Sequence, residues 1–319
     1  VIVHSYEQWG DDCCLRFDGM FAFALWDLSK ETLLLARDRC GIKPLYYARL
    51  RDGRFLFASE IKSILQYEGV RRGVDLEALH YYLNLRFVPR EKTLFRGIRR
   101  LLPGCLMRVA GGEVRIRRYW SLTPASRRRS EDYFIAKIRK ALTGAVRRHL
   151  ISDVPLGVLL SGGIDSSAIL AFASRVSDEP IKAFTMGFGE GADEIGDARY
   201  VAEAFGADHK TLLSQVDILK EYPRMIWYAD MPKRNLYPYY IMREASKHVK
   251  VLLGGLGGDE LFGGYEWKYQ FAEDVERERK AIPHPLMATL SKKVDNLIRY
   301  TCRHGSIFDI EHVHQLKRV

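Results

Sequence analysis

Residues 157–170 read GVLLSGGIDSSAIL, an apolar run that meets two glycines and then a segment with helical character. Glycine lets the backbone approach a ligand closely, and successive backbone N–H groups in such a turn can surround an anion. A helix beginning near Asp165 would add its positive end, and Ser161 and Ser166 would add hydroxyl donors. Because ligands of open α/β sheets bind beyond the carboxyl ends of the strands, this stretch predicts a phosphate-binding loop.

The loop lacks the lysine of the GxxxxGK[ST] motif, so we do not expect a transferred γ-phosphate held by that lysine. Asp165 would repel a bare phosphate but suits a phosphate that carries Mg²⁺. A structural alternative stays open at this point. The same residues could form a tight strand–helix turn in which Asp165 and the serines only cap the helix.

A second glycine-rich stretch, LLGGLGGDELFGGY at residues 252–265, also follows a predicted strand. Its six glycines carry a backbone-entropy cost that a plain loop would avoid. Asp259 supplies a second carboxylate, which we expect to approach Asp165 at the strand ends. Two acids and two glycine-rich turns at one sheet edge favour a Mg-nucleotide site over packing.

Strands and helices alternate around both loops, which predicts a parallel α/β sheet. The predicted strands lie at 156–160, 181–188 and 249–255, and the predicted helices at 135–146, from about 165, and at 197–207.

The first hundred or so residues have the two-residue period of strands instead. Apolar segments at 20–27, 32–38, 44–50 and 54–59 are separated by turn residues, which predicts antiparallel hairpins. We expect a helix with Asp75 as its N-cap and another hairpin about Gly111 and Gly112. The polar, arginine-rich stretch 121–131 predicts a linker, so the expected domains are 1–120 and 132–319.

Bulk composition narrows the class of protein. The 319 residues carry a net charge of +10, but the excess arginines gather around a turn and the linker without interleaved aromatic residues, so we expect no nucleic-acid partner. No apolar run approaches the roughly 20 residues of a membrane span, so we expect no membrane partner.

The five cysteines form no CxxC pair, which predicts reduced thiols and a cytoplasmic location, with Cys13 and Cys14 as packing residues. The first residue is Val1, so we expect part of a longer chain.

SGGIDSS resembles the pyrophosphate-binding loop (PP-loop) of the N-type ATP pyrophosphatases, and its pairing with GGDELFGGY resembles the glutamine-hydrolysing asparagine synthetase family. The segments GMFAFALWD, ARDRCGIKPLYY, FASEIKSIL and LLPGCLMRV…YW are similar to the second half of that family's glutaminase domain. The resemblance covers about residues 1–268. It implies an α/β fold, in which a Rossmann-like PP-loop domain with a parallel sheet follows part of an N-terminal-nucleophile-type antiparallel β domain.

The resemblance also implies ATP-dependent amidation of a carboxylate through an acyl-adenylate, with release of AMP and pyrophosphate. In its simplest form aspartate becomes asparagine with ammonia derived from glutamine, and Mg²⁺ is required. A homodimer is consistent with it. Asp165 and Asp259 would be catalytic and would hold Mg²⁺. The implied ATP-binding residues are Leu160, Ser161, Gly162, Gly163, Asp165, Ser166, Met186, Gly254 and Gly255.

Three features depart from the family pattern. The family's glutaminase uses an N-terminal cysteine, and residue 1 here is valine, so we expect no glutaminase activity from these residues alone. The sequence also stops before the family's downstream catalytic lysine region. Finally, Leu256 stands where the family usually has an acid, although Glu260 could take that role.

Leu256 therefore favours a sibling amidotransferase, such as a β-lactam synthetase, that acts on another carboxylate. A tRNA-modifying enzyme could use the same loop, and a non-catalytic nucleotide-binding protein is also compatible with these motifs.

Overall fold

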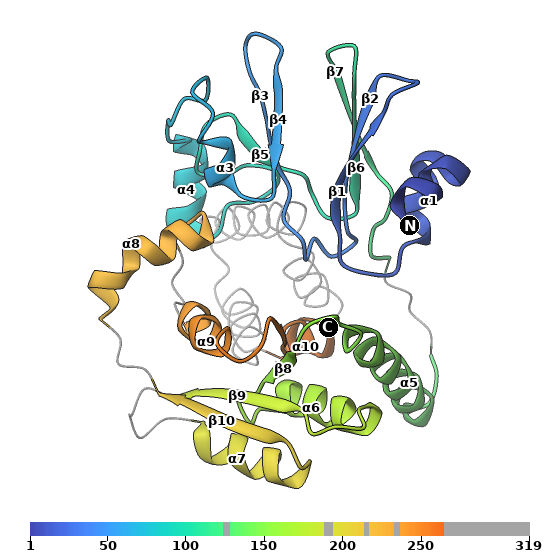
Figure 1. The fold of residues 1–319 in the computed structure, drawn as a ribbon, viewed down its shortest axis with the longest axis vertical. Coiled ribbons are helices and arrows are strands. Elements are labelled where there is room, and N and C mark those ends of the chain that lie inside the picture. The colour runs from blue at the N-terminus through green and yellow to red at the C-terminus, as the bar shows by residue number, and fades with distance from the viewer. Residues whose placement is uncertain (124–127, 188–193, 214–216, 233–236, 265–319) are drawn as a thin grey trace, which may run out of the picture. The chain divides into compact units, whose positions relative to one another are not determined.

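The structure, a computed structural model, describes residues 1–123, 128–187, 194–213, 217–232 and 237–264 (Figure 1). They fall into two compact units, one within Val1–Pro124 and the other within Ala125–Phe271. No helix in these ranges is long and apolar enough to cross a membrane.

The first unit contains two antiparallel sheets, as the two-residue period predicts. One sheet has the order β1-β2-β6-β7, formed by Ala22–Asp27, Thr32–Arg37, Cys105–Ala110 and Glu113–Arg118. The other has the order β4-β3-β5, formed by Phe55–Ala58, Tyr46–Arg49 and Ile98–Arg100. The predicted hairpin about Gly111 and Gly112 is confirmed, because β6 and β7 pair on either side of it.

The helices of the first unit were only partly predicted. Helix α4, Leu76–Leu85, begins after Asp75, whose carboxylate accepts a hydrogen bond from the Ala78 N–H at 3.0 Å, so the predicted N-cap is confirmed. Helix α3, Ile61–Ile64, and the N-terminal elements α1, Ile2–Trp9, η1, Gly10–Asp12, and α2, Cys13–Arg16, were not predicted. Cys13 and Cys14 are fully buried in the core, which confirms their packing role.

The second unit is built on a parallel sheet with the order β10-β9-β8-β11, of which β8, β9 and β10 are labelled in Figure 1. Its strands are β8, Leu156–Leu159, β9, Lys182–Gly187, β10, Asp208–Leu213, and β11, Val251–Leu253. Strand β10 was missed because its first three residues are polar. The chain adds β9 on one side of β8 and β11 on the other, so the strand order reverses at β8. Parallel sheets of this kind bind ligands at such a point.

Helices cover both faces of this sheet. Helices α5, Glu131–His149, α6, Ile164–Val176, and α7, Ile195–Ala204, share one core with Val158, Leu160 and Ala183. Helices α8, Ile218–Ala229, and α9, Tyr237–Ala245, pack on the opposite face against Phe184 and Met186. The last helix described is α10, Gly258–Phe262. Alternate residues of the central strands therefore serve two separate cores.

Candidate functional site

The two predicted loops meet where the strand order reverses. The first loop leaves β8 and enters α6, and the second leaves β11 and enters α10. Between them lies a cavity of about 310 Å³. Of the predicted site residues, its walls include Leu160, Ser161, Asp165, Ser166, Gly254, Gly255 and Asp259.

The first loop is held closed by its own serines. The Ser161 N–H donates to the Ser166 hydroxyl at 3.1 Å, and the two hydroxyl oxygens lie 2.9 Å apart. The Ser166 hydroxyl also donates to the Gly163 carbonyl at 3.2 Å, so this buried side chain is already engaged inside the loop. Ser161 is less buried, and its hydroxyl is the one of the pair better placed to turn toward a ligand.

Gly162 and Gly163 shape the loop without lining the cavity. Gly162 has a φ of 81°, a left-handed conformation that side-chain-bearing residues rarely adopt. A Cβ atom there would also lie 2.6 Å from the Asp197 Cβ at the start of α7. Gly163 is the N-cap residue of α6, which exposes the first amides of that helix at the loop.

The second loop packs directly on the start of α6. A Cβ atom on Gly255 would lie 2.7 Å from the Asp165 Cβ and 2.8 Å from the Ser166 backbone nitrogen. A Cβ atom on Gly258 would collide with the carboxylate of Asp165. The glycines of this stretch therefore let a strand end and a helix start touch.

Close packing brings acidic groups together. Burial, followed by the negative charge of Asp259, raises the pKa of Asp165, and the charge of Glu260 acts in the same direction. The backbone N–H of Asp259 partly offsets these effects. Asp165, whose ionised form the charge of Asp259 destabilises, and Asp259 form a hard-oxygen donor set in one cavity that a divalent cation would neutralise.

The described residues hold no cluster of three or more histidine, cysteine, aspartate or glutamate side chains with metal-binding geometry. Mg²⁺ does not need one, because it usually keeps several waters and takes one or two carboxylates together with substrate phosphates. Asp165 and Asp259 therefore fit Mg²⁺ held with a nucleotide.

Leu256 and Glu260 complete this wall of the cavity. The Leu256 side chain is 93% exposed and borders the cavity rather than packing beneath the loop. The Glu260 carboxylate accepts a hydrogen bond from the Gly257 N–H at 3.0 Å and so caps α10. Glu260, which could replace the acid that the family usually has at position 256, thus already makes a hydrogen bond to the backbone.

Met186, another predicted site residue, lies in a core and does not line the cavity. It is 4% exposed and packs with Met225, Tyr240 and Ile241 on the α8–α9 face of the sheet. The cavity wall instead contains Ile241 of α9 and Leu159 of β8, neither of which was predicted from the sequence. No local motif marks Ile241, because only the packing of α9 on the sheet brings it there.

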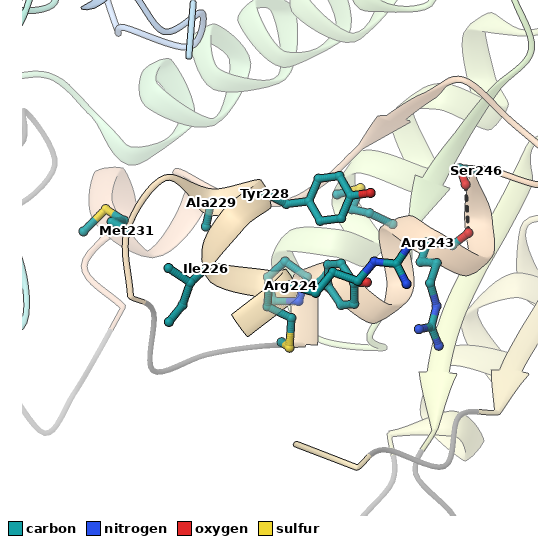
Figure 2. Close-up of a pocket in the computed structure, with 11 residues that line it drawn as sticks. Arg224, Ile226, Tyr228, Ala229, Met231, Arg243 and Ser246 are labelled. Carbon is teal, nitrogen blue, oxygen red and sulfur yellow. Dashed lines mark hydrogen bonds between the residues drawn. The ribbon is translucent and has the colours of Figure 1, made fainter. Parts of the chain in front are cut away.

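A second cavity, of about 550 Å³, lies between α8 and α9 (Figure 2). Three methionines and two tyrosines are among its eleven lining residues, including Met225, Tyr228 and Tyr239. In Figure 2 Arg224 and Arg243 lie toward one end, and Ile226 and Met231 toward the other. None of the predicted site residues lines this cavity.

Comparison with known proteins places both loops in one family model. The asparagine synthase model matches residues 137–315, and the glutamine amidotransferase domain model matches residues 1–120. These matches confirm the resemblance indicated by the motifs.

Named relatives agree with the family models. A putative glutamine-hydrolysing asparagine synthetase of Mycobacterium bovis is 42% identical over 306 residues, which cover 92% of this chain and 46% of that protein. The glutamine-hydrolysing asparagine synthetase 1 of Bacillus subtilis is 35% identical over 271 residues, with 83% and 42% covered. The amidase chyE of Penicillium rubens is 31% identical over 291 residues, with 83% and 43% covered. The chain thus spans a little under half the length of each of these relatives.

Proposed function

Because this chain belongs to the asparagine synthase family, we propose that it carries out ATP-dependent amidation of a carboxylate as part of its full-length protein. The observation that carries this proposal is the 310 Å³ cavity at the strand reversal. There Ser161 and Ser166 of the first loop and the two acids Asp165 and Asp259 line the same space. Such a site suits the polyphosphate of ATP better than it suits a neutral ligand.

The loop residues have distinct parts in this proposal. The first amides of α6 would bind the pyrophosphate portion of ATP, with the Ser161 hydroxyl as a further donor, while Gly162 and Gly163 give the loop the shape that exposes these amides. Leu160, Gly254 and Gly255 would contact the remainder of the nucleotide, and Met186 would support it from the neighbouring strand. Asp165 and Asp259 would hold Mg²⁺, which would neutralise charge on the phosphates.

The proposed chemistry has two steps. An oxygen of the substrate carboxylate attacks the α-phosphorus of ATP, and the bond from that phosphorus to the oxygen bridging to the β-phosphate breaks, which releases pyrophosphate. Ammonia then attacks the carbonyl carbon of the acyl-adenylate, and the bond to AMP breaks as the amide forms. A cradle of preorganised amides stabilises the charge that develops on the leaving pyrophosphate.

Aspartate as the acyl substrate and glutamine as the ammonia source are the simplest form of the proposal. The match of residues 1–120 to a glutamine amidotransferase domain supports the second of these. The same proposal includes an N-terminal-nucleophile-type domain, a homodimer and a cytoplasmic location.

Leu256 supports a second candidate, amidation of a carboxylate other than aspartate. An acid at this position could orient an amine or accept a proton from ammonia, and leucine can do neither. The exposed Leu256 side chain borders the cavity and would present apolar surface to the acyl group. A substrate with a larger or less polar acyl group than aspartate would fit such a wall.

Pyrophosphate release from Mg-ATP, measured across a panel of carboxylic acids, tests both candidates. Asp165→Asn and Asp259→Asn should each weaken Mg-ATP binding at least about tenfold, since each removes a charged ligand. Asp178→Asn, at an exposed aspartate just beyond the far end of α6, is the matched control. Unchanged Mg-ATP binding in both site variants would reject the proposed nucleotide site.

The same panel separates the substrates. Aspartate with the highest kcat/KM, and asparagine as the product, would reject the second candidate. Preference for another acid, shifted toward aspartate in Leu256→Glu, would support it.

A further inference from the structure

Two polar side chains connect the middle of the parallel sheet to the start of the phosphate loop. Thr185 of β9 is 1% exposed, and its hydroxyl donates to the Leu160 carbonyl at 2.7 Å. The Nε2 atom of His209, on β10, lies 2.8 Å from the same hydroxyl oxygen. The chain of contacts runs from β10 through β9 to the residue just after β8.

The single proton of the Thr185 hydroxyl fixes which group donates in each of these two hydrogen bonds. A threonine hydroxyl has a single proton, and here that proton points to the Leu160 carbonyl. The His209 Nε2 must therefore carry a proton and donate it to Thr185. Burial, followed by the positive charge of Arg199, lowers the pKa of His209, which favours the neutral imidazole, while Glu203 acts in the opposite direction.

At Leu160, directly after β8, the polypeptide leaves the sheet. Its N–H donates to the Phe184 carbonyl at 2.9 Å, so β9 binds both backbone groups of Leu160 through consecutive residues. The next N–H, that of Ser161, already turns to the Ser166 hydroxyl inside the loop. The orientation of the Leu160 peptide therefore decides where the loop begins.

We propose that Thr185 and His209 are positioning residues for the phosphate loop, acting through the carbonyl of Leu160. Valine and threonine share the same branched shape at Cβ, so packing alone does not call for a hydroxyl at position 185. Without the hydroxyl, the Leu160 carbonyl would lose its side-chain donor, and the Ser161 peptide would be less restrained. The nucleotide as the ligand of the loop rests on the proposed function, but the restraint of the loop does not.

The test compares variants that remove the hydrogen bonds from His209 through Thr185 to the Leu160 carbonyl with variants that keep them. Thr185→Val and His209→Leu remove a donor, whereas Thr185→Ser keeps the hydroxyl and His209→Gln keeps an N–H donor near the Nε2 position. Thr211→Val makes the same change as Thr185→Val at the residue paired with Thr185 on β10 and is the matched control.

Two quantities are measured on the full chain. Amide hydrogen exchange of Leu160 and Ser161, without any ligand, reports the restraint of the loop. We expect about tenfold faster exchange in Thr185→Val and His209→Leu, the size of effect that one lost hydrogen bond allows. Titration with Mg-ATP should give a Kd about tenfold weaker in the same two variants, with near wild-type values in Thr185→Ser and His209→Gln.

The exchange measurement decides the inference even if the wild-type chain fails to bind Mg-ATP, an outcome that would count against the proposed function instead. Exchange at Leu160 and Ser161 that is equal in Thr185→Val and Thr211→Val would overturn the inference. If Thr185→Val does not fold, the comparison of His209→Leu with His209→Gln replaces it. Equal exchange in that pair would overturn the inference as well.

Discussion

Replacing Gly255 by alanine tests whether the close contact between the second loop and α6 builds the cavity. The added Cβ atom would lie 2.7 Å from the Asp165 Cβ, 2.8 Å from the Ser166 nitrogen and 2.9 Å from the Asp165 carbonyl carbon. Two of these are backbone atoms of the first turn of α6, which cannot rotate away as a flexible side chain would. The loop and the helix must therefore separate.

Overpacking of this kind lowers the free energy of unfolding by about 1–3 kcal/mol. With about 2–4 °C lost per kcal/mol in domains of this size, Gly255→Ala should lower the Tm by several degrees. Mg-ATP affinity should fall too, because Asp259 would move away from Asp165. Differential scanning calorimetry and Mg-ATP titration measure the two effects.

Gly254→Ala is the control for stability. Its Cβ atom would meet only the Leu159 Cδ1 at 3.8 Å, an ordinary van der Waals distance, so the Tm should change little. A Gly255→Ala variant with wild-type Tm and Mg-ATP affinity, or equal loss of stability in both alanine variants, would refute the reasoning.

Two further predictions concern single ionisable groups. Burial and the charge of Asp259 raise the pKa of Asp165, so its ionisation makes the folded state less stable as the pH rises through the folded-state pKa. Without metal, Asp165→Asn should therefore have a higher Tm than wild type at pH 7. This gain in Tm should shrink as the pH falls toward and below about 3.9, the ordinary aspartate pKa. A variant with a lower Tm than wild type at pH 7 would contradict this prediction. Among the described cysteines, Cys40 is exposed whereas Cys13, Cys14 and Cys105 are buried, and burial raises the pKa of Cys14 to about 12. Peptide mapping after a thiol reagent is added to the native protein should find Cys40 labelled before Cys13, Cys14 and Cys105. Early labelling of Cys14 would argue against the packed core.

Short-range patterns in the sequence are enough to predict the local elements and the chemistry of the loops. A period of two residues, a period of 3.6 residues and turn glycines are properties of short segments, so they predict the hairpins, the parallel α/β unit and the start of α6 without any long-range contact. The residue types of the two glycine-rich loops were likewise enough to indicate the asparagine synthase family.

Which segments meet depends on contacts between elements that are far apart in the sequence. The position of β11 beside β8, rather than beside β10, brings Asp259 to Asp165, and no local signal specifies that strand order. It also puts Met186 in a core while Ile241 lines the cavity, and it carries His209 through Thr185 to Leu160. These contacts join residues far apart in the chain, and packing between elements sets them, whereas propensity acts only between near neighbours along the backbone.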